Sequence, residues 1–302
     1  MPGLAIIIPV YNENPQVGEV LDRVLQVRGE QPWEIIAVDD ASTDGTAEVL
    51  EKFGDRIRVI RHAANYGYGA SLKTGIHATQ ARSVVFMDAD GQHDPAYLPT
   101  LVEHLQQCDF VIGMRKSQEG VPYIRRPGKL VLKVVVNFLV GRVINDVNYG
   151  FRGGRRKLYL RMLDVLPDGF SFSTTSLVYV LKSRFTVRFL EIPSQARKGV
   201  SMVRIFRDGM NTLLLCVRLI MLFDPMRAFA GPALCLIGMG LLYQVYILVW
   251  KGLHVEGGAI LSILAGIVLF HFALLADQIA AMRKEISAHA SLIEEHLHAD
   301  RD

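Results

Sequence analysis

The chain has 302 residues, half of them apolar, and its 33 Lys and Arg residues against 30 Asp and Glu residues give a net charge of +3. This composition excludes an intrinsically disordered chain, because it can bury ample apolar surface. The small net charge argues against a nucleic-acid-binding protein, and three widely spaced cysteines predict neither a disulfide framework nor a cysteine-based metal site.

Short runs rich in β-branched residues alternate with segments of helical period along the front of the chain. We expect strands at 5–8, 34–38, 58–60, 84–87 and 110–112, and helices at 17–27, 47–53, 70–81 and 97–107. This alternation predicts right-handed βαβ units around a mostly parallel, Rossmann-like sheet. The stretch 113–128, rich in Gly, Pro and charge, is predicted to be a long loop.

Two long uncharged segments, 228–250 and 257–276, follow near the C-terminal end. Each can cross a hydrocarbon core of about 30 Å as a helix, and the short link 251–256 predicts a hairpin. A hairpin buried in a soluble core is the alternative. We therefore divide the chain into a catalytic α/β domain (1–202), a juxtamembrane amphipathic segment (203–227), two transmembrane helices (228–282) and a tail (283–302).

Basic residues flank the two apolar segments unevenly. Arg218 and Arg227 precede the first segment, and Arg283 and Lys284 follow the second, whereas Lys251 is the only Lys or Arg of the link. The positive-inside rule then places the catalytic domain and both termini in the cytoplasm.

Polar side chains follow three of the predicted strands directly. Tyr11 follows the first strand, Asp40 the second, and Asp88 and Asp90 the fourth. Ligands of open parallel sheets bind beyond the carboxyl ends of the strands, so these groups are expected to converge on one crevice. Two carboxylates two residues apart, with Gln92 nearby, suit a hard cation that also binds a diphosphate, although an isolated Asp-x-Asp triplet is more often a turn.

Four motifs in order resemble the family 2 glycosyltransferases of GT-A fold. They are Ile8-Pro9-Val10-Tyr11-Asn12-Glu13, Val38-Asp39-Asp40-Ala41-Ser42-Thr43-Asp44-Gly45-Thr46, Asn65-Tyr66-Gly67-Tyr68-Gly69-Ala70 and Asp88-Ala89-Asp90-Gly91-Gln92. Within the family the chain is most similar to the polyprenyl-phosphate glycosyltransferases, the group that includes dolichyl-phosphate mannose synthase. The motifs Gly113-Met114-Arg115, 146–152 and 197–201 and the terminal hairpin support this resemblance.

The resemblance implies a role for each matching residue. Pro9, Tyr11, Glu13, Val38 and Asp40 would hold the base and ribose of a nucleotide sugar, with Lys73 and Asp88 also binding this donor. Asp88, Asp90 and Gln92 would hold Mg²⁺ or Mn²⁺, with Asp90 and Arg115 as catalytic residues. Arg125, Arg197 and Ser201 would bind the phosphate of the acceptor.

Two departures from the family pattern matter. Met202 stands where the family often has Lys, and the segment 170–176 has hydroxyls where many relatives have acids. A sugar-hydroxyl acceptor normally needs a general base, whereas a phosphate is already ionised, so the missing acid favours a lipid phosphate acceptor. A base elsewhere in the chain and a loss of activity are the alternatives.

The expected function is therefore transfer of one sugar from a nucleoside diphosphate sugar to polyprenyl phosphate at the membrane, with inversion; we also allow for a homo-oligomer. A processive polysaccharide synthase is an alternative, but Trp33 and Trp250 lie outside the Gln-x-x-Arg-Trp motif of such enzymes. A catalytically silent nucleotide-sugar-binding scaffold is another. Met202 and Ser173 leave it open, and the intact acids of the motifs argue against it.

Overall fold

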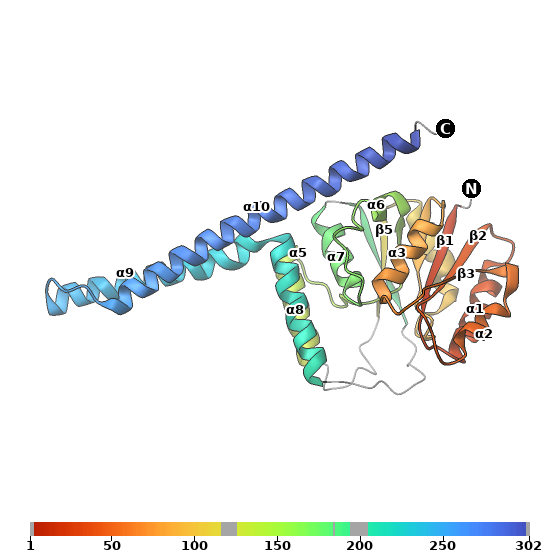
Figure 1. Ribbon diagram of the computed structural model, residues 1–302, viewed down its shortest axis with the longest axis horizontal. Coiled ribbons are helices and arrows are strands. Elements are labelled where there is room, and N and C mark those ends of the chain that lie inside the picture. The colour runs from red at the N-terminus through yellow and green to blue at the C-terminus, as the bar shows by residue number, and fades with distance from the viewer. Residues whose placement is uncertain (1–2, 116–125, 184, 194–204, 300–302) are drawn as a thin grey trace. The chain divides into compact units, whose positions relative to one another are not determined.

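A computed structural model describes residues 3–115, 126–183, 185–193 and 205–299 (Figure 1). The chain divides into two compact units, Met1–Thr212 and Leu213–Asp302.

The first unit is built on a seven-stranded sheet of order β3-β2-β1-β4-β6-β5-β7. The strands are β1 (Leu4–Val10), β2 (Trp33–Asp39), β3 (Arg58–Arg61), β4 (Ser83–Phe86), β5 (Phe110–Arg115), β6 (Arg152–Arg155) and β7 (Val187–Ile192). β6 runs antiparallel to β4 and β5, and the other neighbours are parallel. The predicted mostly parallel sheet is confirmed.

Helices cover both faces of this sheet (Figure 1). One face packs on α1 (Gln16–Arg28), α2 (Thr46–Glu51) and α4 (Leu98–Leu105), and the other on α3 (Tyr68–Ala78), α6 (Arg156–Leu160) and α7 (Phe172–Lys182). The unit also contains α5 (Arg126–Val140) and the 3₁₀ helices Gly54–Arg56 and Pro95–Tyr97. β1 is buried along its whole length, with Ile6 and Ile8 in one core cluster and Ile7 in the other. A central strand that is buried on both faces needs apolar residues at successive positions, which explains the continuous apolar run in the sequence.

The predicted strands and helices of the front part are confirmed, with ends shifted by up to three residues. The predicted loop 113–128 is wrong at both ends, because β5 continues to Arg115 and α5 already begins at Arg126. Strands β6 and β7 were not predicted.

The second unit is dominated by two helices, α9 (Pro225–Lys251) and α10 (Gly257–Ala299), joined by a short link. A third helix, α8 (Ile205–Phe223), crosses the division between the units. Ser262 Oγ donates to the Leu236 carbonyl across the pair at 2.9 Å. A Cβ at Gly240 would lie 2.7 Å from an Ile263 side-chain carbon, so small residues let the helices approach closely.

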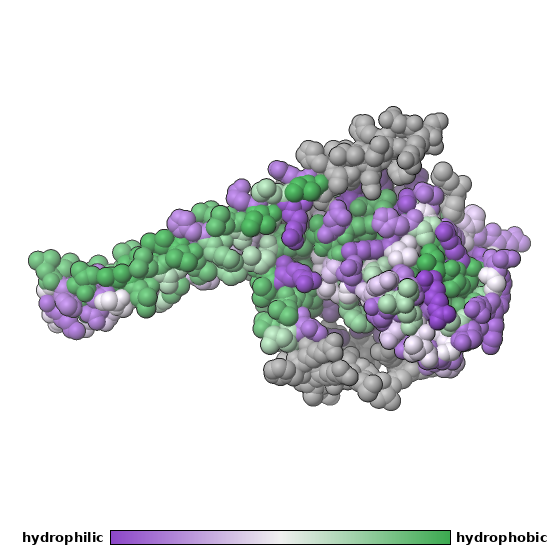
Figure 2. Space-filling model, viewed as in Figure 1, coloured by the Kyte–Doolittle hydropathy of each residue, from purple (hydrophilic) through white to green (hydrophobic). Residues whose placement is uncertain are grey.

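Two helices of the described part are long and apolar enough to cross a membrane, Pro225–Lys251 and Gly257–Arg283. Figure 2 shows hydrophobic residues along the surface of this pair. Only 17% and 22% of their most apolar windows are buried, which argues against the core hairpin of a soluble protein. The predicted hairpin is confirmed as a pair of long apolar helices, although the first begins at Pro225 and α10 continues through most of the predicted tail.

Candidate active site

The carboxyl ends of β1, β2 and β4 bring the predicted polar residues to one edge of the sheet. β1 and β2 are paired up to Val10 and Asp39, and the Asp40 N–H donates to the Val10 carbonyl at 2.9 Å. β4 pairs with the other side of β1, so Asp88 follows a strand adjacent to the same edge. The convergence expected from the sequence is therefore present.

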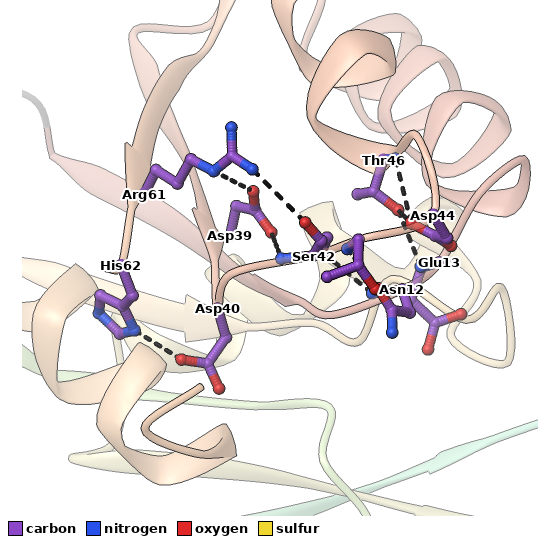
Figure 3. Close-up of polar contacts among 10 residues, drawn as sticks. Asn12, Glu13, Asp39, Asp40, Ser42, Asp44, Thr46, Arg61 and His62 are labelled. Atoms are coloured by element: carbon purple, nitrogen blue, oxygen red, sulfur yellow. Dashed lines mark hydrogen bonds and ion pairs between the residues drawn. The ribbon is translucent and has the colours of Figure 1, made fainter. Parts of the chain in front are cut away.

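The loops after β1 and β2 are tied together by side chains (Figure 3). The Asn12 N–H donates to Ser42 Oγ at 3.0 Å, and the Thr43 N–H donates to Asn12 Oδ1 at 2.8 Å. Asp39 is buried, accepts from the Ser42 N–H at 3.0 Å and lies 3.3 Å from Arg61 Nε. Asn12 has a φ of 52°, a left-handed conformation that is uncommon outside glycine and frequent at functional sites.

Asp40 is buried and binds a neighbouring loop (Figure 3). Its Oδ1 accepts from the Tyr66 N–H at 2.9 Å and lies 2.7 Å from His62 Nδ1, and its Oδ2 accepts from the Gly67 N–H at 2.8 Å. On the other side of the imidazole, Nε2 lies 2.9 Å from Thr74 Oγ1. A carboxylate has about four acceptor sites, so three internal contacts leave room for one ligand donor.

Asp88 is held from two sides. The Tyr68 hydroxyl donates to Asp88 Oδ1 at 2.9 Å, and burial raises the pKa of Tyr68, which keeps this phenol protonated. The Asp88 N–H donates to His93 Nδ1 at 2.9 Å, and His93 Nε2 lies 3.6 Å from Asp88 Oδ2. Burial lowers the pKa of His93 to about 4, so the imidazole is neutral near pH 7 and carries its proton on Nε2.

Asp90 and Arg115 both contact Gln92, the first at its backbone and the second at its side chain. Asp90 Oδ1 accepts from the Gln92 N–H at 3.0 Å, and Arg115 Nη2 donates to Gln92 Oε1 at 3.4 Å. Arg115 also lies 3.8 Å from Asp146 and 5.2 Å from the centre of the Tyr149 ring. The end of β5 thus brings a guanidinium beside the predicted metal residues.

The residue types at this edge fit Mg²⁺ or Mn²⁺. Among the described residues, no three His, Cys, Asp or Glu side chains are placed to hold an ion by themselves. Two carboxylates and an amide oxygen would need phosphate and water oxygens to complete the coordination, which is usual for Mg²⁺. A Cβ at Gly150 would lie 2.7 Å from Asp88 Oδ2, so glycine leaves room for the carboxylate.

The other predicted residues differ in how the structure places them. Pro9 and Val38 are neighbouring residues in the β1–β2 ladder, and Tyr11 is partly exposed at its end. The Glu13 N–H donates to Thr46 Oγ1 at 3.0 Å. Lys73 Nζ lies 2.7 Å from Asp168 Oδ1. Arg125, Arg197 and Ser201 lie outside the described residues, and all of these roles stay predictions.

Sequence reasoning missed several side chains that shape the site. His62, Thr74 and His93 are examples, and His93 follows the quoted motif by one residue, which is a signal that could have been used. Arg152 is fully buried, and its guanidinium donates to the carbonyls of Tyr149 and Ser173 and, at 3.2 Å, to Ser176 Oγ. It thereby links β6 to the start of α7, which lies in the segment 170–176 that has hydroxyl residues and no acids.

Ligands of open α/β sheets bind beyond the carboxyl ends of the strands, and the acidic cluster of this chain lies at that edge, so the fold and site are those of an α/β ligand-binding domain. Residues 5–164 match the family model described as glycosyl transferase family 2, and residues 224–282 match the GtrB C-terminal hairpin. The chain belongs to glycosyl transferase family 2.

Curated relatives match over part of their length. A dodecaprenyl-phosphate galacturonate synthase of Rhizobium johnstonii is 31% identical over 46% of this chain and 43% of its own. An undecaprenyl-phosphate 4-deoxy-4-formamido-L-arabinose transferase of Edwardsiella ictaluri is 27% identical over 63% of this chain and 58% of its own. The chain thus spans about half the length of these relatives.

Solved structures are similar in fold. Glucosyl-3-phosphoglycerate synthase from Mycobacterium tuberculosis, solved with Mn²⁺, uridine diphosphate and phosphoglyceric acid, matches with a TM-score of 0.55 and 21% identity. The match covers 71% of this chain and 78% of that one. At this identity the likeness establishes the fold of the first unit.

Proposed function

We propose that this protein transfers a single sugar from a nucleoside diphosphate sugar to a polyprenyl phosphate. One observation carries the proposal: the same chain contains a family 2 domain, which has an acidic site, and a C-terminal hairpin of the GtrB type. Two relatives named for transfer to dodecaprenyl and undecaprenyl phosphate support the acceptor class.

The donor would bind at the ends of β1 and β2. Pro9, Tyr11, Glu13 and Val38 are assigned to the base and ribose, and the remaining acceptor site of Asp40 would take a base N–H. Lys73 is engaged by Asp168, so its part in donor binding would be indirect.

Asp88, Asp90 and Gln92 would hold Mg²⁺ or Mn²⁺ with the donor diphosphate. The cation would neutralise charge on the leaving diphosphate. The Tyr68 hydroxyl holds the Asp88 carboxylate, His93 accepts from the Asp88 backbone N–H, and Arg115 adds a guanidinium that can bind phosphate oxygens. Asp90 and Arg115 are therefore assigned as the catalytic residues.

The start of α7 supports an acceptor that needs no general base. Ser173, Thr174 and Ser176 are buried there, and their polar groups are bonded within the protein: Thr174 donates to Asn148, and Ser176 accepts from Arg152. A lipid phosphate is ionised at neutral pH and can attack the anomeric carbon in line, which inverts it. Arg115, Arg125, Arg197 and Ser201 are assigned to the phosphates.

Competition between acceptors tests this function. We expect transfer from the preferred nucleotide sugar to undecaprenyl phosphate at least about a hundredfold faster than to undecaprenol or an oligosaccharide, because ionised phosphate needs no base. The measurement is radiolabelled sugar recovered in each product from one reaction. Transfer to the free alcohol at the rate seen with the phosphate would contradict the proposal.

The hairpin would anchor the enzyme with the first unit and both termini in the cytoplasm. The proposed regions are catalytic (1–202), juxtamembrane (203–227), membrane-spanning (228–282) and C-terminal (283–302), and homo-oligomerisation stays a prediction. Arg218 and Arg227, before the apolar segment 228–250, and Arg283 and Lys284, after the apolar segment 257–276, support this orientation.

Cysteine labelling tests the orientation. In a background with Cys108, Cys216 and Cys235 replaced by Ser or Ala, a cysteine at His254 in the link should react with an impermeant maleimide added outside intact cells. A cysteine at exposed Asp55 serves as the cytoplasmic control and should react only after lysis. Protection of position 254 until lysis would reverse the topology.

A further inference from the structure

The loop before α7 is fixed on the first turn of α3. A Cβ at Gly69 would lie 2.2 Å from the Pro167 carbonyl oxygen, so only glycine lets the two backbones approach this closely. The Ala70 N–H donates to the Asp168 carbonyl at 3.0 Å, and Lys73 Nζ lies 2.7 Å from Asp168 Oδ1. These contacts give the next residues of the loop a defined position.

Phe170 is the side chain that this loop presents. It is 87% exposed, and its ring stacks on Tyr68 with the centroids 5.7 Å apart and the planes 15° from parallel. The hydroxyl of the same Tyr68 donates to Asp88. A single aromatic ring therefore separates an exposed phenyl group from a carboxylate of the proposed metal site.

The fold does not account for this exposed ring. Burying a phenylalanine side chain stabilises a protein, and a side chain 87% exposed gains little of that stabilisation. Single exposed apolar residues are common on surfaces. Phe170 differs because hydrogen bonds, an ion pair and a close glycine contact hold its loop in place beside a polar site, and apolar groups beside such sites line ligand pockets.

We propose that Phe170 contacts the first isoprene units of the lipid acceptor, and that the Lys73–Asp168 ion pair positions it. This inference rests on the function proposed above. The acceptor phosphate must reach the anomeric carbon beside the diphosphate, so the isoprene unit bonded to that phosphate lies close to the same carboxylates. A phenyl ring has no polar atom and matches the hydrocarbon, whereas a sugar presents hydroxyl groups that need polar partners.

Steady-state kinetics of Phe170→Ala and Phe170→Leu test this contact. With undecaprenyl phosphate in detergent micelles, we expect KM for the lipid to rise about tenfold in Phe170→Ala and less in Phe170→Leu, because each loses part of a buried apolar contact. KM for the nucleotide sugar and the melting temperature should stay unchanged. Val59→Ala on the edge strand β3 removes an exposed apolar side chain elsewhere and is the matched control.

A separate variant tests whether the Lys73–Asp168 ion pair positions Phe170. Lys73→Met should raise KM for the lipid in the same direction as Phe170→Ala, and combining the two changes should add little, because both act through one ring. Fully additive effects would overturn the positioning role of Lys73.

Photocrosslinking provides a readout without turnover. p-Benzoylphenylalanine at position 170 should label with radioactive undecaprenyl phosphate in the absence of donor, and the same group at position 59 should not. The inference would be overturned by an unchanged lipid KM in Phe170→Ala or by equal labelling at positions 170 and 59. It would also be overturned if only the KM for the nucleotide sugar rose, because that result would indicate a sugar stacked on the ring. Wild-type protein that transfers nothing to undecaprenyl phosphate from any of a panel of nucleotide sugars, including donors of galacturonate and of 4-deoxy-4-formamido-L-arabinose, would instead reject the proposed function.

Discussion

Asp90→Asn is expected to lower the rate of sugar transfer by about two to three orders of magnitude while the fold survives. Asp90 follows β4 by a few residues and is partly exposed, and its Oδ1 accepts from the N–H of Gln92 in the same turn, a bond that the amide oxygen of Asn can also accept. Losing one negative ligand would remove several kcal/mol of charge stabilisation from the leaving diphosphate.

Initial rates across a Mn²⁺ titration, together with Mn²⁺ binding followed by electron paramagnetic resonance with nucleoside diphosphate present, measure this effect. Asp55→Asn, which changes an exposed acid in the 3₁₀ helix Gly54–Arg56, is the matched control and should behave as wild type. Full activity of Asp90→Asn in excess chelator would reject the metal assignment.

Asp40→Ala is expected to destabilise the first unit by about 3 kcal/mol and to weaken nucleotide binding at least tenfold. The change leaves the N–H groups of Tyr66 and Gly67 and the ring of His62 without their acceptor. These three contacts are partly buried, so each lost bond costs about 1 kcal/mol. The loop that follows β3 then loses the contact that holds it at the sheet edge.

Thermal unfolding measures the loss, which corresponds to a fall of roughly 6–12 °C in Tm for a domain of this size. Thr74→Val removes only the hydroxyl on the far side of His62 and should cost about 1 kcal/mol, with nucleotide binding retained. Equal effects of the two variants would show that Asp40 does not act through the Tyr66 and Gly67 backbone.

The predictable parts of the fold are those with a strong local pattern. β1, β2 and β4 are apolar, rich in β-branched residues and buried on both faces, so their sequences carry the signal of a parallel sheet. β6 carries no such signal. Gly153 and Gly154 form its centre because a Cβ at Gly154 would lie 2.4 Å from the Phe110 ring, and this constraint comes from distant side chains.

The candidate site likewise has one part that the sequence predicts and another part that it does not. Asp88, Asp90 and Gln92 stand together in one motif, and their chemistry can be read from their spacing. The partners of Asp40 cannot, because His62 and Gly67 reach it only after β3 and α3 have packed beside β2. The roles of Arg125, Arg197 and Ser201 rest on the resemblance alone.

α10 has a consequence for experiments on the whole enzyme. It is one helix of 43 residues, and its span-forming part is Gly257–Arg283. About four further turns, roughly 24 Å, therefore continue beyond the apolar segment as helix. A fluorophore attached near Ala299 would stand off from the lipid headgroups on a stiff spacer. Energy transfer from such a label to a dye in the bilayer would then report a defined distance, as a flexible tail could not.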